Sequence, residues 1–258
     1  MVVEILVPAC LALIYRYTVE PGNGGYGPFA LYSVFTCCLI VITFIDMRHR
    51  IIPDAISLPM IPLFVLAGMS IPGMYETEPP LLEGSIAFLL CAAGLIVYVI
   101  FKVLMIAHRK KKQKLIYSLL FLLPILVALL MFLDTRQEIF SEAMRSRFLS
   151  SMSGVLVGGV FIWVQAVFGN LLFRQETMGR GDIKLMLGVG AVLGWKSALM
   201  TALFAPVPGA IVGGYIYLVY KSKKIAYGPF IALSAFAMIF LGKALFDLIT
   251  YPFLLKFV

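Results

Sequence analysis

Two aspartates lie at the ends of apolar segments, where a charged side chain is costly. Asp46 ends the segment 28–45, and Asp182 follows the turn 179–181 and opens the apolar run that begins at Ile183. An ionisable residue at the edge of a lipid-facing segment is a candidate functional residue. Two carboxylates held close together cannot both ionise cheaply, so the pair shares a proton. Such a pair offers the base and the acid that an aspartic protease needs.

The residues around Asp182 favour a tight turn followed by a helix. Gly179 and Gly181 let the backbone turn and pack closely, because neither has a Cβ atom. Asp182 then opens the helix, where free N–H groups and the helix dipole favour a carboxylate. The alternative interpretation is that the acids act independently: Asp182 caps a helix, and Asp46 pairs with a neighbouring arginine.

The composition predicts an α-helical membrane protein. Of the 258 residues, 62% are hydrophobic and 13% are charged, whereas soluble domains contain about 25% charged residues. The apolar segments are longer than the roughly 9–11 residues of a membrane β-strand. We therefore expect an all-α, polytopic helix bundle that folds as a single domain. About nine membrane segments are predicted, at approximately 5–17, 28–45, 55–69, 85–107, 115–133, 152–173, 183–193, 198–220 and 229–249.

Lysine and arginine predict how these segments are oriented. Basic clusters occur at 48–50, 109–114, 174–184 and 221–224, and alternating the segments from an inside N-terminus places all four on one side. The positive-inside rule makes that side cytoplasmic. Asp46 and Asp182 then both lie at cytoplasmic ends. The net charge of +8 is explained by topology and by contact with anionic lipids, so nucleic acid is not expected as a partner.

The cysteines do not predict a metal site. Cys10, Cys37, Cys38 and Cys91 all lie within apolar segments, and the chain contains no CxxC pair. Neither a zinc site nor a disulfide framework is therefore indicated. We expect no metal and no cofactor.

At the aspartate segments, the sequence resembles the bacterial type IV prepilin peptidases, a branch of the GxGD intramembrane aspartyl proteases. Residues 179–182 match the GxGD motif, and 183–185 and 190–195 match its usual continuation. Residues 45–59 resemble the first aspartate segment, and 227–230 resemble the segment before the last span. The resemblance covers roughly 1–70 and 150–250.

This resemblance implies an enzyme with Asp46 and Asp182 as the catalytic pair, and with Gly179 and Gly181 shaping the loop. Such enzymes use no metal. They remove the short basic leader from prepilins or pseudopilins of type IV pilus and type II secretion systems. The resemblance further implies cleavage at the cytoplasmic face of the bacterial inner membrane. There are two alternatives. One is an archaeal preflagellin peptidase, and the other is a proton-coupled transporter that uses the same acids. The oligomeric state is not predicted.

Two features depart from the family pattern. Bifunctional members carry two CxxC pairs in a cytoplasmic segment near the N-terminus, and this chain begins about where that segment would end. The missing pairs argue against N-methyl transfer by this chain. The region 84–149 has no clear counterpart, and we interpret it as an inserted helical hairpin with a loop. An even number of added spans keeps Asp46 and Asp182 on one side.

Three further charged residues near the aspartates have open roles. Asp54 follows the turn at Pro53 and either caps the next helix or recognises the basic leader of a substrate. The same two roles are open for Glu176. Lys184 lies two positions after Asp182, on a different face of a helix, so we expect it to contact lipid headgroups or a loop.

Overall fold

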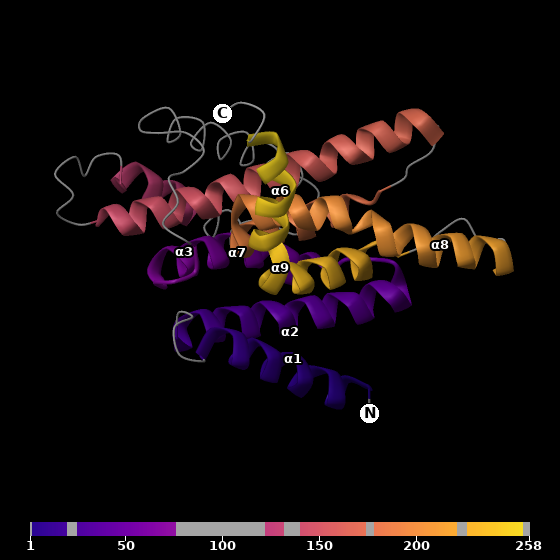
Figure 1. The fold of residues 1–258 in the computed structure, drawn as a ribbon, viewed down its shortest axis with the longest axis horizontal. Coiled ribbons are helices and arrows are strands. Elements are labelled where there is room, and N and C mark those ends of the chain that lie inside the picture. Colours follow the sequence, from indigo (N-terminus) through magenta and orange to yellow (C-terminus); the bar gives the residue numbers. More distant parts are fainter. Residues whose placement is uncertain are drawn as a thin grey trace, which may run out of the picture.

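The computed structural model describes residues 2–19, 25–75, 122–131, 140–173, 178–220 and 226–254. The described residues are almost entirely helical, which confirms the all-α class. A helix at Leu122–Met131 carries no label in Figure 1. The labelled helices of the described part are α1 (Val2–Val19), α2 (Tyr26–His49), α3 (Asp54–Ser70), α6 (Glu142–Phe173), α7 (Arg180–Phe204), α8 (Pro206–Tyr220) and α9 (Gly228–Leu254).

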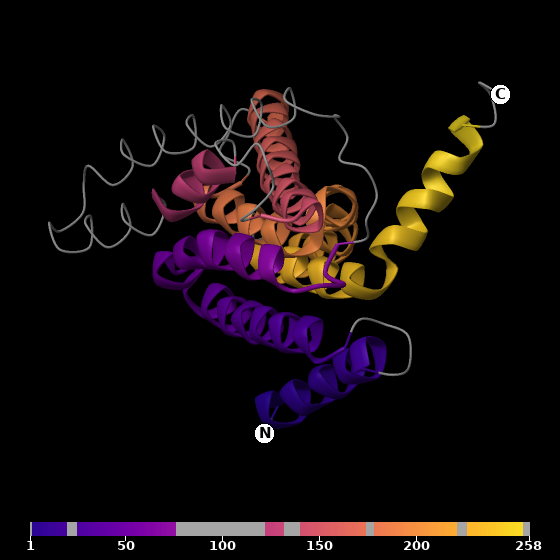
Figure 2. The same cartoon turned by 90° about the vertical axis from the view of Figure 1, so that its left-hand side faces the viewer.

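Helix α7 is the central element of the bundle. It packs against α3, α6 and α9, while α2 packs between α1 and α9. Figure 2 shows α1, α2 and α3 as successive layers on one side, with α6 crossing above α7. Buried residues of α2, α3, α6, α7 and α9 form one continuous hydrophobic core. The helices that carry the two aspartates, α2 and α7, are both joined to it.

The described residues contain four helical stretches that are long and apolar enough to cross a membrane. They are Tyr26–His49, Glu142–Leu172, Arg180–Ile216 and Gly228–Thr250. Two shorter apolar helices, Asp54–Ser70 and Leu122–Met131, accompany them. The chain is thus an integral membrane protein, although the described part does not contain all of the nine expected segments. The expected segment 85–107, and 115–133 apart from 122–131, lie outside the described residues.

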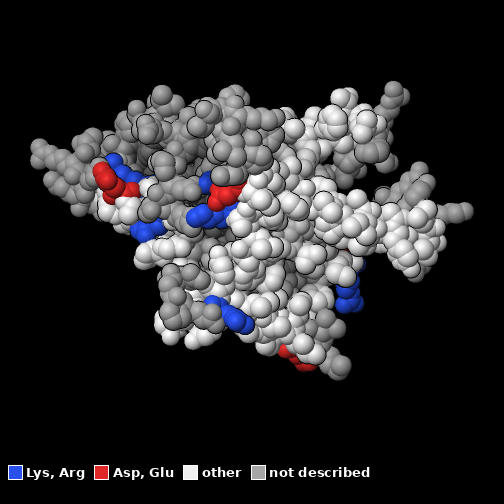
Figure 3. Space-filling view, in the orientation of Figure 1, with Lys and Arg blue, Asp and Glu red and all other residues white. Residues whose placement is uncertain are grey.

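The surface of the helices agrees with a lipid environment. In Figure 3, the described surface facing the viewer carries few charged side chains among many uncharged ones. Large apolar side chains are widely exposed, among them Leu171, Ile211 and Leu218. Apolar exposure on this scale marks a membrane or protein contact surface, and the lengths of the helices favour the membrane.

Two helix boundaries differ from the sequence prediction. Helix α6 begins at Glu142, ten residues before the predicted segment 152–173, so the end of the presumed insertion 84–149 belongs to a long helix. The predicted gap between 193 and 198 is not a loop. It is a break at Gly194, whose φ of 74° interrupts α7 while the helix continues to Phe204. Pro206 then starts α8, because proline is favoured in the first turn of a helix.

Side chains from two other segments compensate the break in α7. The carbonyl of Ala191 accepts hydrogen bonds from the Tyr75 hydroxyl and, at 2.8 Å, from the Ser151 hydroxyl. An unpaired carbonyl in an apolar bundle would cost several kcal/mol, on the order given for a lipid-exposed polar group. These two hydroxyls hold the broken helix against α6 and against the segment that follows α3.

Glycines bring α6 and α7 into backbone contact. A Cβ atom on Gly154 would lie 2.2 Å from the Gly190 carbonyl oxygen, and one on Gly158 would lie 3.0 Å from that of Met186. Small residues four positions apart are typical of close helix packing in membranes. The Gln165 amide adds a 3.0 Å hydrogen bond to the carbonyl of Ala202 on α7. The two helices are therefore fixed in register.

We predict that Gly154→Ala destabilises the protein by about 1–3 kcal/mol, because the added methyl group meets rigid backbone. Thermal unfolding in detergent measures the loss. Gly214→Ala is the matched control, since a Cβ atom there meets no atom within 4 Å. Equal melting temperatures for the two variants would contradict the backbone contact between α6 and α7.

Candidate active site

Asp46 lies in the last turn of α2, and its environment is set by the end of that helix. The chain turns at Arg50, whose φ of 55° is left-handed and whose N–H donates to the Asp46 carbonyl at 2.7 Å. The Asp46 side chain is only 5% exposed. Its Oδ2 atom accepts a 3.0 Å hydrogen bond from the backbone N–H of Gly228, at the start of α9.

Asp182 lies in the first turn of α7. Gly179 is the N-cap residue, and its N–H donates to Oδ2 of Asp182 at 3.0 Å, while the Asp182 N–H donates to the Gly179 carbonyl at 3.1 Å. This is the reciprocal pattern that closes a helix N-terminus. The side chain is 7% exposed. The predicted capping interaction is therefore present, although Asp182 is the third helical residue and does not open the helix itself.

The two carboxylates share one cavity. Asp46 and Asp182 both line a hollow of ≈ 590 Å³ together with residues 50–55, which lead into α3, and residues 179–181 at the start of α7. The hollow thus brings together two acids from helices that are far apart in the chain. Chemically, a coupled carboxylate pair beside an open cavity can accept one proton and donate another.

Asp54 and Lys184 form a salt bridge on the wall of this cavity. Lys184 Nζ lies 2.6 Å from Asp54 Oδ1, and the two side chains are 14% and 22% exposed. Asp54 is the first residue of α3 and follows its N-cap, Pro53, so its role in capping and its role in leader recognition both stay predictions. Lys184 contacts protein at Asp54, which favours the loop contact over the headgroup contact. The bridge ties α3 to α7.

The two glycines of the loop differ in what they permit. Gly181 lies against Ile52, and a Cβ atom there would come within 2.9 Å of the Ile52 Cβ atom. At Gly179 an added Cβ would be 3.4 Å from Asp182 Oδ2, which is ordinary contact, and its φ of −77° suits any residue. Close packing therefore requires glycine at 181 more strictly than at 179.

One predicted residue is outside the described part of the chain, and one contact was not foreseen. Glu176 lies outside the described residues. The bond from Gly228 to Asp46 was not predicted, because a backbone N–H carries no sequence signal. The neighbouring phenol of Tyr227 also lies near the site: burial raises its pKa, and the charge of Asp182 adds to that effect.

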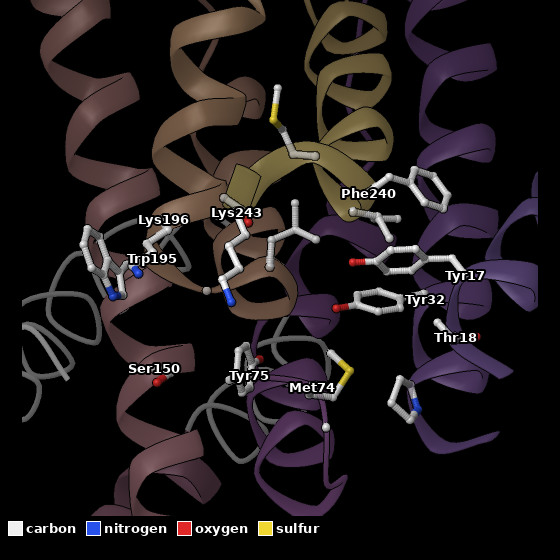
Figure 4. A pocket seen from close by; sticks show the side chains of 17 residues that line it. Tyr17, Thr18, Tyr32, Met74, Tyr75, Ser150, Trp195, Lys196, Phe240 and Lys243 are labelled. Atoms are coloured by element: carbon white, nitrogen blue, oxygen red, sulfur yellow. The ribbon is translucent and has the colours of Figure 1, made fainter. Parts of the chain in front are cut away.

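A second cavity, of ≈ 470 Å³, lies beside the break in α7. Figure 4 shows the hydroxyls of Tyr17 and Tyr32 and the amine of Lys243 directed into it. Gly194 also lines it. Twelve helical residues at about 1.5 Å each separate Gly194 from Asp182, a distance of about 18 Å. None of these residues was predicted, and the cavity is separate from the aspartates.

Comparison with known proteins supports the family resemblance. The profile of the type IV leader peptidase family matches residues 33–214, a range that includes both aspartates. No solved structure matches the chain.

Several similar proteins bear the name prepilin leader peptidase/N-methyltransferase. One from Xanthomonas campestris pv. campestris is 24% identical over 250 residues, which is 95% of this chain and 60% of that protein. One from Aeromonas salmonicida is 32% identical over 95 residues, or 36% of this chain and 33% of that protein. One from Burkholderia pseudomallei is 30% identical over 105 residues, or 39% and 33%. The chain spans at most about three fifths of these relatives.

We predict that Gly181→Ala destabilises the protein by about 1–3 kcal/mol, because Ile52 is buried and cannot easily yield. Gly179→Ala should cost less than about 1 kcal/mol. Chemical or thermal unfolding of both variants in detergent checks the difference. A larger loss at 179 than at 181 would contradict the packing described.

We predict that Asp54 and Lys184 are energetically coupled by about 1.5–3 kcal/mol, the usual range for a hydrogen bond to a charged group. The measurement is a double-mutant cycle of unfolding free energies with Asp54→Asn, Lys184→Gln and the double variant. Additive losses would show that the salt bridge contributes nothing.

Proposed function

The chain belongs to the type IV leader peptidase family, and on this basis we propose that it is an intramembrane aspartyl endopeptidase. Its substrates are type IV prepilins or pseudopilins, from which it removes the short basic leader. Its location is the bacterial cytoplasmic membrane, with the aspartates at the cytoplasmic face. The relatives are named as bacterial prepilin peptidases, which favours this branch over an archaeal one.

The observation that carries the proposal is the pairing of Asp46 and Asp182. Both carboxylates are largely buried, and both line one cavity. Burying two acids costs desolvation free energy that two apolar side chains would not cost. Stability alone therefore does not explain why acids occupy these positions. Each acid uses Oδ2 to accept a backbone N–H. Among the described residues neither Oδ1 accepts a hydrogen bond, so these atoms face water and substrate in the mechanism below.

Peptide hydrolysis follows from a pair that holds one proton. The ionised aspartate takes a proton from a water molecule as the water oxygen bonds to the scissile carbonyl carbon. The protonated aspartate donates to the carbonyl oxygen. The C–N bond then breaks, and a proton passes to the leaving amine, so that a carboxylic acid and an amine are released and the pair again holds one proton.

Other residues have supporting roles in this proposal. Gly179, the N-cap of α7, and Gly181, in its first turn, shape the backbone beside Asp182. Asp54 and Lys184 form the wall beside the pair. Asp54 also offers a carboxylate to the basic leader of the substrate. Membrane lipids surround the helices. No cofactor takes part in the proposed reaction, and N-methyl transfer is not proposed for this chain.

We predict that Asp46→Asn and Asp182→Asn each abolish cleavage of a prepilin-like substrate in liposomes, with at least a thousandfold loss of rate, because either change removes an acid–base group. Unfolding temperatures should stay close to that of the parent. Asp247→Asn, at an exposed aspartate of α9, is the matched control and should cleave normally. Normal turnover by either of the first two variants would refute the proposed function.

A further inference from the structure

The start of α9 is a third element of the aspartate site. Gly228 is the first residue of α9 and is buried. Its N–H donates to Oδ2 of Asp46 at 3.0 Å. This bond joins residues on two helices that are distant in the chain but packed side by side. Among the described residues, this backbone N–H is the donor that the Asp46 carboxylate has.

Only glycine permits this contact. A Cβ atom on Gly228 would lie 2.6 Å from Oδ2 and 3.2 Å from Cγ of Asp46, and 3.4 Å from Ile52 Cδ1. The first distance is shorter than real Cβ contacts, so alanine would push the carboxylate away from the N–H. Asp46 lines the cavity that it shares with Asp182, so the displaced carboxylate would move into that space and lose its bond to Gly228.

The position of this N–H also supplies favourable electrostatics. The first N–H groups of a helix are unpaired and carry a partial positive charge, which stabilises a carboxylate. Gly228 donates this N–H to Asp46, and Asp46 shares a cavity with Asp182. The turn 227–228 can therefore set where the Asp46 carboxylate lies relative to Asp182.

We propose that Gly228 is a positioning residue, which holds the Asp46 carboxylate in register with Asp182 through its N–H and through its lack of a side chain. The proposal rests on the proposed peptidase function. It assigns no proton transfer to Gly228. Its consequence is a specific one: displacing Asp46 should slow the chemical step and leave substrate binding largely intact.

The test is Gly228→Ala in the full chain, reconstituted in liposomes with a prepilin-like peptide. A displacement on the order of 1 Å at a reacting group costs about 100-fold in rate. We expect kcat to fall by about that factor while KM changes less than about threefold. A kcat within threefold of the parent would overturn the proposal.

A second glycine on the same helix controls for a general loss of packing. At Gly242, a Cβ atom would lie 2.3 Å from Ser197 Oγ and 2.7 Å from Ser197 Cβ, far along α9 from Asp46. Gly242→Ala should lower the melting temperature without the loss of kcat. An equal loss of kcat in both variants, after correction for folded protein, would assign the effect to packing and overturn the proposal.

A spectroscopic readout keeps the proposal testable if Gly228→Ala does not fold. In protein labelled with ¹⁵N-glycine, Asp46→Asn should move the amide resonance of Gly228, whereas Asp247→Asn should leave it in place. An unmoved resonance would overturn the proposal. A folded parent that cannot cleave would instead refute the peptidase function, whereas cleavage with normal kcat in Gly228→Ala would refute only the role of Gly228.

Discussion

A carboxylate buried in an apolar helix bundle must find hydrogen-bond donors, and this constraint organises the whole site. Side-chain donors would be costly to bury themselves, whereas the first turn of a helix has unpaired N–H groups that need acceptors. Asp182 takes such a group from Gly179, and Asp46 takes one from Gly228. Each acid is thus stabilised at a helix start, and each helix start is satisfied by an acid.

The positions of the two acids therefore depend on where α7 and α9 are held in the bundle. Helix α7 carries Asp182 and is fixed by backbone contact with α6, where Gly154 and Gly190 leave room for no side chain. The Lys184 salt bridge adds a link to α3. Helix α9 packs on both α2 and α7. Close packing of small residues therefore positions the acids, because lipid provides no hydrophobic drive for helices to associate.

The sequence predicted that Asp46 and Asp182 lie on one side, because each lies at an end of an apolar segment and an even number of segments separates them. It also located the interruption after Leu193, which the structure identifies as a break in one helix. It did not predict the salt bridge of Asp54, since Lys184 is 130 positions away. The role of Gly228 was equally hidden, because its contribution comes from the backbone and from the absence of a Cβ atom.

The central claim is that Asp46 and Asp182 act as one catalytic unit. Residues that act as a unit are strongly non-additive in their effects on rate. The most direct test compares cleavage rates of a prepilin-like peptide by the two single Asn variants and by the double variant in liposomes. The account predicts that the double variant is no slower than either single one. Losses that multiply would show that the two aspartates contribute independently and would contradict it.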